Sequence, residues 1–237
     1  MDARIVILTG AGISAESGLP TFRGAGGLWE GRRFEEVATP EAFARDPAQV
    51  HRFYNYRRRQ LQDAAIAPNS AHLALAELER RWPGEVLVVT QNVDNLHERA
   101  GQQRLIHMHG QLDAVRCLHC AWQGEWQGDL EVDDVCPHCR RTAGLRPDIV
   151  WFGEMPLALD KIEDALDACD LFIAIGTSGH VYPAAGFVEA VRADGLAHTV
   201  EINLEESLVG SRFEERRYGR ATIEVPRFVE ELLSTYV

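Results

Sequence analysis

The sequence lacks an excess of positive charge. Its 24 lysines and arginines are outnumbered by 36 aspartates and glutamates, which gives a formal net charge of −12. A protein that binds nucleic acid usually carries a basic face, so this balance argues against a nucleic-acid partner. It is compatible with a polypeptide partner that carries lysine.

The sequence also lacks a long apolar run, an N-terminal leader and internal repeats. No apolar stretch reaches the roughly 18 residues that a membrane-spanning helix needs, so we expect no membrane partner. The chain runs directly into a strand-like segment, which favours a cytoplasmic protein. Thiols stay reduced in that compartment, where paired cysteines bind metal more often than they form disulfides.

Short apolar, β-branched runs alternate with helical patterns along the 237 residues. This alternation predicts an α/β fold, a Rossmann-like doubly wound parallel sheet whose loops gather at one edge. The predicted strands are 5–8, 85–90, 105–109, 148–154, 171–176 and 199–203. The predicted helices are 47–62, 71–81, 160–168, 184–193 and 226–236, with a short helix capped by Thr39 before them.

The first predicted strand leads into Gly10-Ala-Gly-Ile-Ser-Ala15, which fits the pattern Gly-x-Gly-x-x-Gly/Ala. In dinucleotide-binding proteins the first glycine permits a tight turn and the second lets backbone N–H groups approach a pyrophosphate. The small third residue, here Ala15, lets the next helix pack close to the sheet. The acidic residue expected about 20 positions later is lacking, because Glu30 lies in a loop-like, glycine-rich segment. Alone, the motif leaves a dinucleotide site and an ordinary turn equally open.

Other polar residues follow predicted strands. Gln91-Asn-Val-Asp-Asn95 lies at a carboxyl end, where open α/β sheets bind ligands, although a helix-capping turn is an equal alternative. His107 and His109 alternate on a strand and so share a face, but the local pattern does not say which of them matters. Tyr54 and Arg57 share a helix face that, by itself, is typical of a solvated surface.

Four cysteines have the spacing Cys-x₂-Cys-x₁₅-Cys-x₂-Cys. Four thiolates at this spacing close a tetrahedral zinc site without an open position for water, so we expect a structural zinc. His119 and His138 are competing ligands that the paired cysteines make unnecessary, and Cys169 reads as a small core residue. The predicted zinc ligands are Cys117, Cys120, Cys136 and Cys139.

The combined motifs resemble those of sirtuins over nearly the whole chain. They occur in the family's order: Gly10-Ala-Gly-Ile-Ser-Ala-Glu-Ser-Gly-Leu-Pro-Thr-Phe-Arg23, Gln91-Asn-Val-Asp94, His109-Gly110, the four cysteines, Gly176-Thr-Ser178 and Asn203-Leu-Glu205. The resemblance implies one catalytic unit over 1–237 that consumes NAD and removes acyl groups from protein lysines. Within it we expect a Rossmann-like core (1–27, 84–112 and 149–237), a helical insertion (28–83) and a small zinc-ribbon insertion (113–148).

The resemblance also implies roles for matching residues. His109 takes the place of the general base, with Asn92 beside it in catalysis and His107 as a structural neighbour. The cofactor-binding set comprises Gly10, Ala11, Gly12, Ala15, Phe22, Arg23, Gln91, Asn92, Asp94, Gly176, Ser178, Asn203, Glu205 and Ala221. Substrate-binding positions are Ala38, Tyr54, Arg57, Val150, Phe152, Gly153 and Glu154, the last four resembling a strand edge that pairs with the substrate backbone.

One departure from the commonest sirtuin pattern concerns the acyl group. Thr21 stands where many sirtuins have Asp, and with Ala38, Tyr54 and Arg57 this resembles the subgroup that removes succinyl and malonyl groups. A buried guanidinium can bind the carboxylate of such a chain through two hydrogen bonds, and a tyrosine hydroxyl can add a third. The resemblance therefore places Tyr54 and Arg57 in an acyl pocket.

The implied reaction yields nicotinamide, O-acyl-ADP-ribose and free lysine, with neutral His109 as general base. Three alternatives use parts of the same sequence. A dehydrogenase shares the glycine turn but lacks the acidic second-strand residue. A non-catalytic acyl-lysine-binding module would not need Asn92, Asp94 and His109 together. A mono-ADP-ribosyltransferase would cleave NAD in the same way but use another acceptor.

Overall fold

The computed structural model describes residues 3–20, 28–29, 32–193, 195 and 197–236. Six parallel strands form its main sheet in the order β11-β10-β9-β1-β4-β5. Counted along the chain, this is the order 3-2-1-4-5-6 of a Rossmann sheet, which confirms the predicted fold class. The strands are β1 (Ile5–Thr9), β4 (Val86–Thr90), β5 (Leu105–His107), β9 (Leu171–Ile175), β10 (His198–Asn203) and β11 (Glu215–Tyr218).

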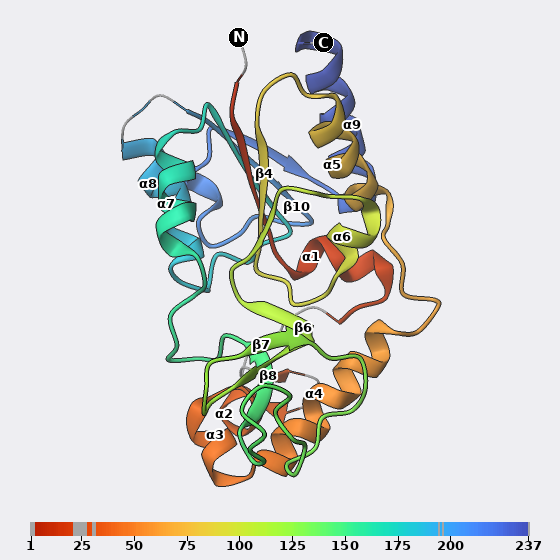
Figure 1. Cartoon of the computed structure of the whole chain (residues 1–237). Coiled ribbons are helices and arrows are strands. Elements are labelled where there is room, and N and C mark those ends of the chain that lie inside the picture. The colour runs from red at the N-terminus through yellow and green to blue at the C-terminus, as the bar shows by residue number, and fades with distance from the viewer. Residues whose placement is uncertain (1–2, 21–27, 30–31, 194, 196, 237) are drawn as a thin grey trace.

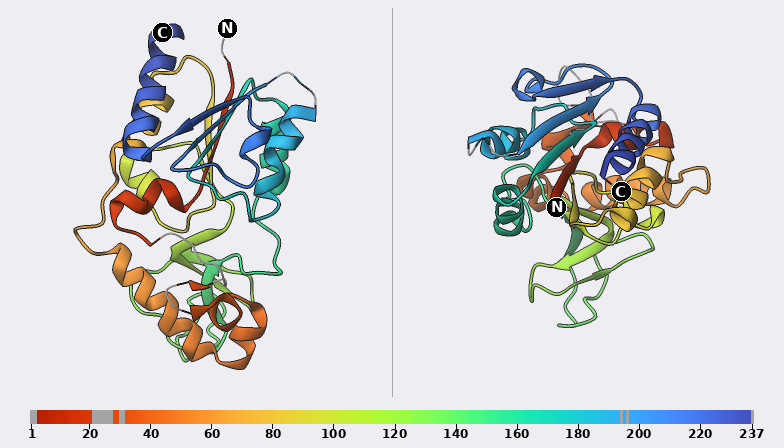
Figure 2. Two further views of the ribbon diagram at one scale, coloured as in Figure 1. Left: turned by 180° about the vertical axis from the view of Figure 1, so that it is seen from behind. Right: turned by 90° about the horizontal axis from the view of Figure 1, so that it is seen from above.

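Helices cover both faces of this sheet (Figures 1 and 2). Strand β1 shows why, because alternate side chains point to opposite faces. Ile5 and Ile7 pack with α5 (Ser70–Arg81) and α9 (Ala221–Tyr236). Val6 and Leu8 pack with α7 (Leu159–Asp167) and α8 (Phe187–Ala193), which follows the 3₁₀ turn Ala184–Gly186. The short helices α1 (Ala11–Ser14) and α6 (Leu96–Ala100) lie on the α5 side (Figure 1).

A smaller lobe lies beyond the carboxyl edge of the main sheet (Figure 1). Its helices α2 (Phe34–Val37), α3 (Pro40–Arg45) and α4 (Pro47–Leu61) follow a two-stranded ribbon, β2 (Leu28–Trp29) and β3 (Arg32–Arg33). Thr39 caps α3 as predicted, and Asp46 caps α4. Its antiparallel sheet has the order β7-β6-β8, formed by β6 (Gly110–Cys117), β7 (Gln123–Glu125) and β8 (Leu145–Ile149).

Several details differ from the sequence predictions. The strand predicted over 148–154 lies at Leu145–Ile149, because Gly153 has a φ of +90° and the chain turns there. Helix α5, which lies within the predicted insertion 28–83, packs against α9 and the main sheet. Strand β11 was not predicted at all, because its exposed and half-buried residues do not form an apolar run. The predicted limits 113 and 148 fall inside β6 and β8, and the division into insertions stays a prediction.

The last helix begins at Ala221 rather than at Pro226 as predicted. Proline has no N–H to donate to the carbonyl four residues earlier. That carbonyl, on Thr222, instead accepts a hydrogen bond from the Ser70 hydroxyl at 2.7 Å. In the part of the chain that the structure describes, no helix has both the length and the apolar character needed to cross a bilayer.

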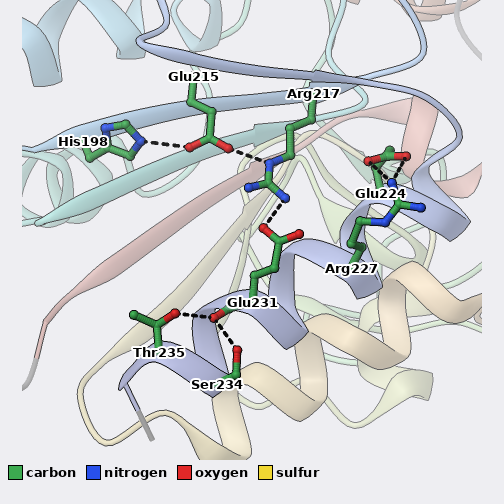
Figure 3. A network of polar contacts seen from close by, with 8 residues as sticks. All are labelled: His198, Glu215, Arg217, Glu224, Arg227, Glu231, Ser234 and Thr235. Atoms are coloured by element: carbon green, nitrogen blue, oxygen red, sulfur yellow. Dashed lines mark hydrogen bonds and ion pairs between the residues drawn. The ribbon is translucent and has the colours of Figure 1, made fainter.

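Helix α9 is also held to the edge of the main sheet by ion pairs (Figure 3). Arg217 of β11 contacts Glu215 at 2.6 Å and Glu231 of α9 at 2.7 Å. His198 of β10 contacts the other oxygen of Glu215 at 3.2 Å. These groups lie near solvent, so each pair contributes little to stability.

Candidate functional site

A cleft of about 770 Å³ opens at the carboxyl edge of the main sheet and is lined by both lobes. This volume lies within the range of small-molecule sites. The cleft lies where β1 and β9 run side by side and the strand order reverses, the usual ligand position in such sheets. The predicted residues that line it are Gly10, Ala11, Gly12, Ala38, Tyr54, Arg57, Gln91, Asn92, Asp94, His109, Val150, Phe152, Gly153, Glu154, Gly176, Ser178, Asn203 and Glu205.

The glycines at the strand ends allow two loops to approach closely. A Cβ on Gly12 would lie 2.6 Å from the Cα of Gly176, and a Cβ on Gly10 would lie 2.8 Å from its oxygen. Gly12 N–H donates to the Gly176 carbonyl at 2.9 Å, and Gly176 has a φ of +64°. Side chains at these positions would therefore clash, and only glycine lets the two loops meet and line the cleft with their backbone. Asn203, which donates to the Thr177 carbonyl at 2.6 Å, and Glu205 line the far end, where a carboxylate suits a ribose hydroxyl.

The packing role predicted for Ala15 is wrong. The helix after the glycine turn has only four residues, and Ala15 begins a 3₁₀ turn (Ala15–Ser17) with its side chain exposed. Ile13, fully buried, makes the contact with the sheet that was predicted for Ala15. Ala221 begins α9 and is not among the residues that line the cleft. Thr21, Phe22 and Arg23 lie outside the described residues, so their predicted roles stay predictions.

Ser14 connects the two predicted polar residues after β4. The Asn92 amide donates to the Ser14 hydroxyl at 3.2 Å and to the Gly10 carbonyl at 3.1 Å. The Ser14 hydroxyl donates in turn to Asp94 at 3.1 Å. Burial raises the pKa of Asp94, against the effect of its hydrogen bonds from Leu96 N–H and Ser14. Sequence reasoning missed Ser14, although it lies within the glycine motif.

The two histidines that the pattern could not distinguish have different partners. The Nδ1–H of His109 donates to the Gln91 carbonyl at 3.2 Å, which fixes the tautomer and leaves Nε2 as an acceptor. Burial lowers the pKa of His109, and the Gln91 hydrogen bond opposes that effect without cancelling it. Its imidazole is therefore neutral and basic at pH 7.

His107 is held between two acceptors, the Asn92 carbonyl at 3.2 Å and Glu98 at 2.7 Å. Burial acts to lower the pKa of His107, but the Glu98 hydrogen bond and charge outweigh it, so that the pKa is raised. Both ring nitrogens are occupied, which suits a structural residue. The hydrogen bonds thus favour His109 as the base, as the resemblance implied.

The predicted acyl-pocket residues are brought together on the small-lobe side of the cleft. Tyr54 and Arg57 lie one turn apart in α4 and are 0% and 6% exposed, so the helix face is not the solvated surface that its pattern suggested. Ala38, 2% exposed, ends α2 beside them. Burial raises the pKa of the Tyr54 phenol, so it stays protonated. A buried tyrosine and arginine can together bind a carboxylate.

Residues 150–154 follow β8 and are not part of a strand, and their pairing with a substrate backbone stays a prediction. The N–H groups of Val150, Phe152 and Glu154 donate to the carbonyls of His109, Ala38 and Trp151, respectively. Glu154 also directs its carboxylate inward, to Arg146. At Gly153, a Cβ would meet no atom within 4 Å, so this turn has open space beside it.

The cleft contains further residues that sequence reasoning did not single out. Trp151 and Thr177 belong to its wall, as do two loops at the carboxyl ends of β9 and β10. Thr177 lies within the motif Gly176-Thr-Ser178, whereas for the others only the position after a strand could have pointed to them. The loop residues are His180, Val181, Tyr182, Glu206, Ser207 and Leu208.

The four paired cysteines converge in the small lobe, each sulfur within 4.8 Å of the others. Cys117 and Cys139 are 3.8 Å apart, as are Cys120 and Cys136. Four thiolates about 2.3 Å from a tetrahedral zinc ion are separated by about 3.8 Å, so the cluster fits a structural zinc. The described histidines are not part of this cluster. Cys169 is a core residue as predicted, and burial raises its pKa to about 11.

Comparison with known proteins agrees with this geometry. The model of the Sir2 family matches residues 10–183. An NAD-dependent protein deacylase of Bdellovibrio bacteriovorus is 61% identical over 237 residues, covering 98% of this chain and 100% of the relative. An enzyme of the same name from Salmonella typhimurium is 60% identical over 232 residues, covering 98% of this chain and 85% of the relative.

Solved structures agree as well. A Sir2 homologue in complex with NAD is 41% identical, with a TM-score of 0.86 over 97% of this chain and 90% of the other. A Sir2 protein bound to a myristoylated histone peptide is 31% identical, with a TM-score of 0.74 over 98% of this chain and 92% of the other. The sheet order, the four-cysteine cluster, the family match and these relatives lead to one conclusion: this chain belongs to the Sir2 family.

Proposed function

We propose that this protein is an NAD-dependent protein-lysine deacylase. The observation that carries the proposal is the hydrogen bonding of His109, whose Nδ1 is anchored to a carbonyl while Nε2 stays an acceptor at the wall of the cleft. The relatives named NAD-dependent protein deacylase support it, as does the solved structure of a Sir2 homologue with NAD. The structural zinc supports the small lobe and takes no part in the chemistry.

Each part of the cleft has a distinct task in this reaction. When bound, NAD supplies an electrophilic ribose carbon that the acyl oxygen can attack. The cradle formed by Gly10, Gly12 and Gly176 would hold the phosphates. Asn92 and Asp94, fixed through Ser14, would orient the ribose and carboxamide. His109 would accept a proton at Nε2 from a ribose hydroxyl of NAD. A neutral imidazole is suited to this role.

The acyl pocket supports a preference for acidic acyl groups such as succinyl and malonyl, with acetyl as a further substrate. A guanidinium binds a carboxylate through two charge-assisted hydrogen bonds, which are about twice as strong as neutral ones. The buried positions of Tyr54 and Arg57 strengthen such contacts, since water competes poorly there. An acetyl group ends in a methyl and uses neither contact.

The test of the proposal is to compare His109→Ala with His107→Ala on acyl-lysine peptides in the presence of NAD. We expect His109→Ala to lose turnover by about a thousandfold, the scale of general base catalysis, while NAD and peptide still bind. His107→Ala should retain more turnover, because both ring nitrogens of His107 are engaged in hydrogen bonds within the protein. Peptide mass and nicotinamide release would be followed together.

Two results would contradict the proposal. Deacylation by His109→Ala at the wild-type rate would remove the base assignment. Nicotinamide release without loss of peptide acyl mass would indicate mono-ADP-ribosyl transfer instead. The natural partners in this account are proteins and peptides bearing acyl-lysine, and a cytoplasmic location stays a prediction that cell fractionation would check.

A further inference from the structure

The hydroxyl of Tyr54 has a defined hydrogen-bond direction. The indole Nε1–H of Trp151 lies 3.0 Å from it, and an indole nitrogen can only donate. The phenol oxygen is therefore the acceptor in this bond, and its own O–H proton points away from the indole. Tyr54 and Trp151 are almost fully buried, at 0% and 2% exposure. Water therefore does not compete for this hydrogen bond, and the hydroxyl keeps one orientation.

Trp151 is itself held rigidly by one arginine and one glutamate. The guanidinium of Arg146, 3% exposed, lies 3.2 Å from the centroid of the indole ring. Arg146 binds both oxygens of Glu154 at 2.6 and 3.0 Å and also donates to the Ile149 carbonyl at 2.7 Å. The same Glu154 accepts the backbone N–H of Trp151 at 2.8 Å. Ring and backbone of Trp151 are thus fixed together.

We propose that Trp151 is a positioning residue for acyl-group selectivity: it makes Tyr54 a hydrogen-bond donor toward an acidic acyl group. The inference rests on the acyl pocket proposed above. A succinyl or malonyl carboxylate can accept a hydrogen bond from the Tyr54 hydroxyl, whereas an acetyl methyl cannot. The chain from indole N–H through phenol O–H to carboxylate is cooperative, because each bond polarises the next.

The test is the ratio of kcat/KM for succinyl-lysine to that for acetyl-lysine, in peptides of one sequence. Trp151→Phe keeps an aromatic ring and removes only the donor edge. We expect this ratio to fall about fivefold, the effect of one net hydrogen bond, mainly through a higher KM for the succinyl peptide. Trp82→Phe is the matched control, because it removes a buried indole donor that binds the Ala3 carbonyl far from the cleft.

A double-mutant cycle separates positioning from general packing. If Trp151 acts through the phenol, Trp151→Phe should not change the ratio further in a Tyr54→Phe background. Equal effects of Trp151→Phe in both backgrounds, or an unchanged ratio in the single variant, would overturn the inference. If Trp151→Phe fails to fold, Arg146→Lys can be tested in its place. Lysine keeps the positive charge but cannot bind both oxygens of Glu154, which holds the backbone of Trp151.

Arg57→Met in the same assay separates the role of Trp151 from the acyl pocket itself. If it removes the succinyl preference and Trp151→Phe does not lower it, only the role of Trp151 falls. If the wild type has no succinyl preference, or Arg57→Met leaves that preference intact, the acyl pocket falls and the Trp151 inference falls with it.

Discussion

The two lobes hold their functional side chains in different ways. In the large lobe, site residues follow parallel strands and are fixed by short bonds to backbone and hydroxyl groups, above two apolar clusters. In the small lobe, buried arginines and a cysteine cluster link the segments around two smaller apolar clusters. Arg58, 2% exposed, binds the carbonyls of Leu112 and Gly128 and the side chain of Asn55.

This difference explains where substitution should be costly. Truncating a buried apolar side chain of the main sheet removes its transfer free energy and leaves a cavity, at about 2–5 kcal/mol, but breaks no hydrogen bond. A buried arginine that links several segments leaves all of its partners without hydrogen bonds when it is removed. Polar substitutions should therefore affect stability most in the small lobe, and catalysis most at the carboxyl edge of the main sheet.

Loss of the metal should have the largest effect. Structural zinc contributes on the order of 10 kcal/mol to the folding of small zinc domains. We expect chelation or Cys136→Ser to remove hydrogen-exchange protection from residues 113–148, while the strands of the main sheet stay protected. Equal loss in both lobes would contradict the distinction between them, and Cys169→Ser, outside the cluster, is the control.

Removal of the Arg58 guanidinium should have the second largest effect on stability. Arg58→Met removes the donor of the buried Leu112 carbonyl and the hydrogen bonds to the Gly128 carbonyl and the Asn55 side chain, so we expect a loss of about 3 kcal/mol in the free energy of unfolding. The neighbouring Arg59→Met is the matched control. Its side chain is 56% exposed and pairs with Asp129, so that loss should stay below about 1 kcal/mol. Denaturant unfolding would measure both, and similar losses would count against the account.

The pH dependence of turnover should show a smaller effect. His109 has a lowered pKa, so its basic form persists below pH 6.5, and turnover should fall about tenfold per pH unit only below that lowered pKa. His107 has a raised pKa, so its pairing with Glu98 stabilises the fold fully below pH 6.5 and less as pH rises through the raised value. Glu98→Gln should therefore reduce stability at acidic pH and leave the turnover profile in place. A turnover profile that shifts with Glu98→Gln would contradict the separate roles.

The smallest effect should come from the ion pairs in Figure 3. Glu231 pairs with Arg217 but is 51% exposed, so Glu231→Gln should change the free energy of unfolding by less than about 1 kcal/mol. Thermal unfolding at low and high salt would measure this. A loss as large as that of Arg58→Met would show that the large lobe, too, depends on charged contacts.

Much of the fold could be predicted because its signals are local. Buried parallel strands give continuous apolar runs, and the cysteine spacing defines a metal site by itself. Strand β11 escaped prediction because it carries Glu215, Arg216 and Arg217 at the edge of the sheet. Helix α9 was predicted too short, because Pro226 is usually a helix breaker and Ser70, distant in sequence, satisfies the carbonyl it leaves free.

The candidate site was predictable by resemblance but less so in its geometry. The distinction between His107 and His109 depends on Glu98 and the Gln91 carbonyl, which no alternation pattern reveals. Trp151 and Tyr54 are 97 residues apart, and their contact forms where the segment after β8 packs against α4. Ala15 was misjudged because the motif implies a long helix, whereas the chain makes a single turn there.

The most direct test of the central claim is NAD-dependent deacylation of matched succinyl-lysine and acetyl-lysine peptides by the wild type and Arg57→Met. A two-point charged contact is worth roughly 1.5–3 kcal/mol, so the succinyl-to-acetyl ratio of kcat/KM should fall about tenfold or more in the variant. An unchanged ratio in Arg57→Met would contradict the acyl pocket. NAD-independent turnover, or none of either peptide by a folded, zinc-loaded protein, would contradict the proposed function itself.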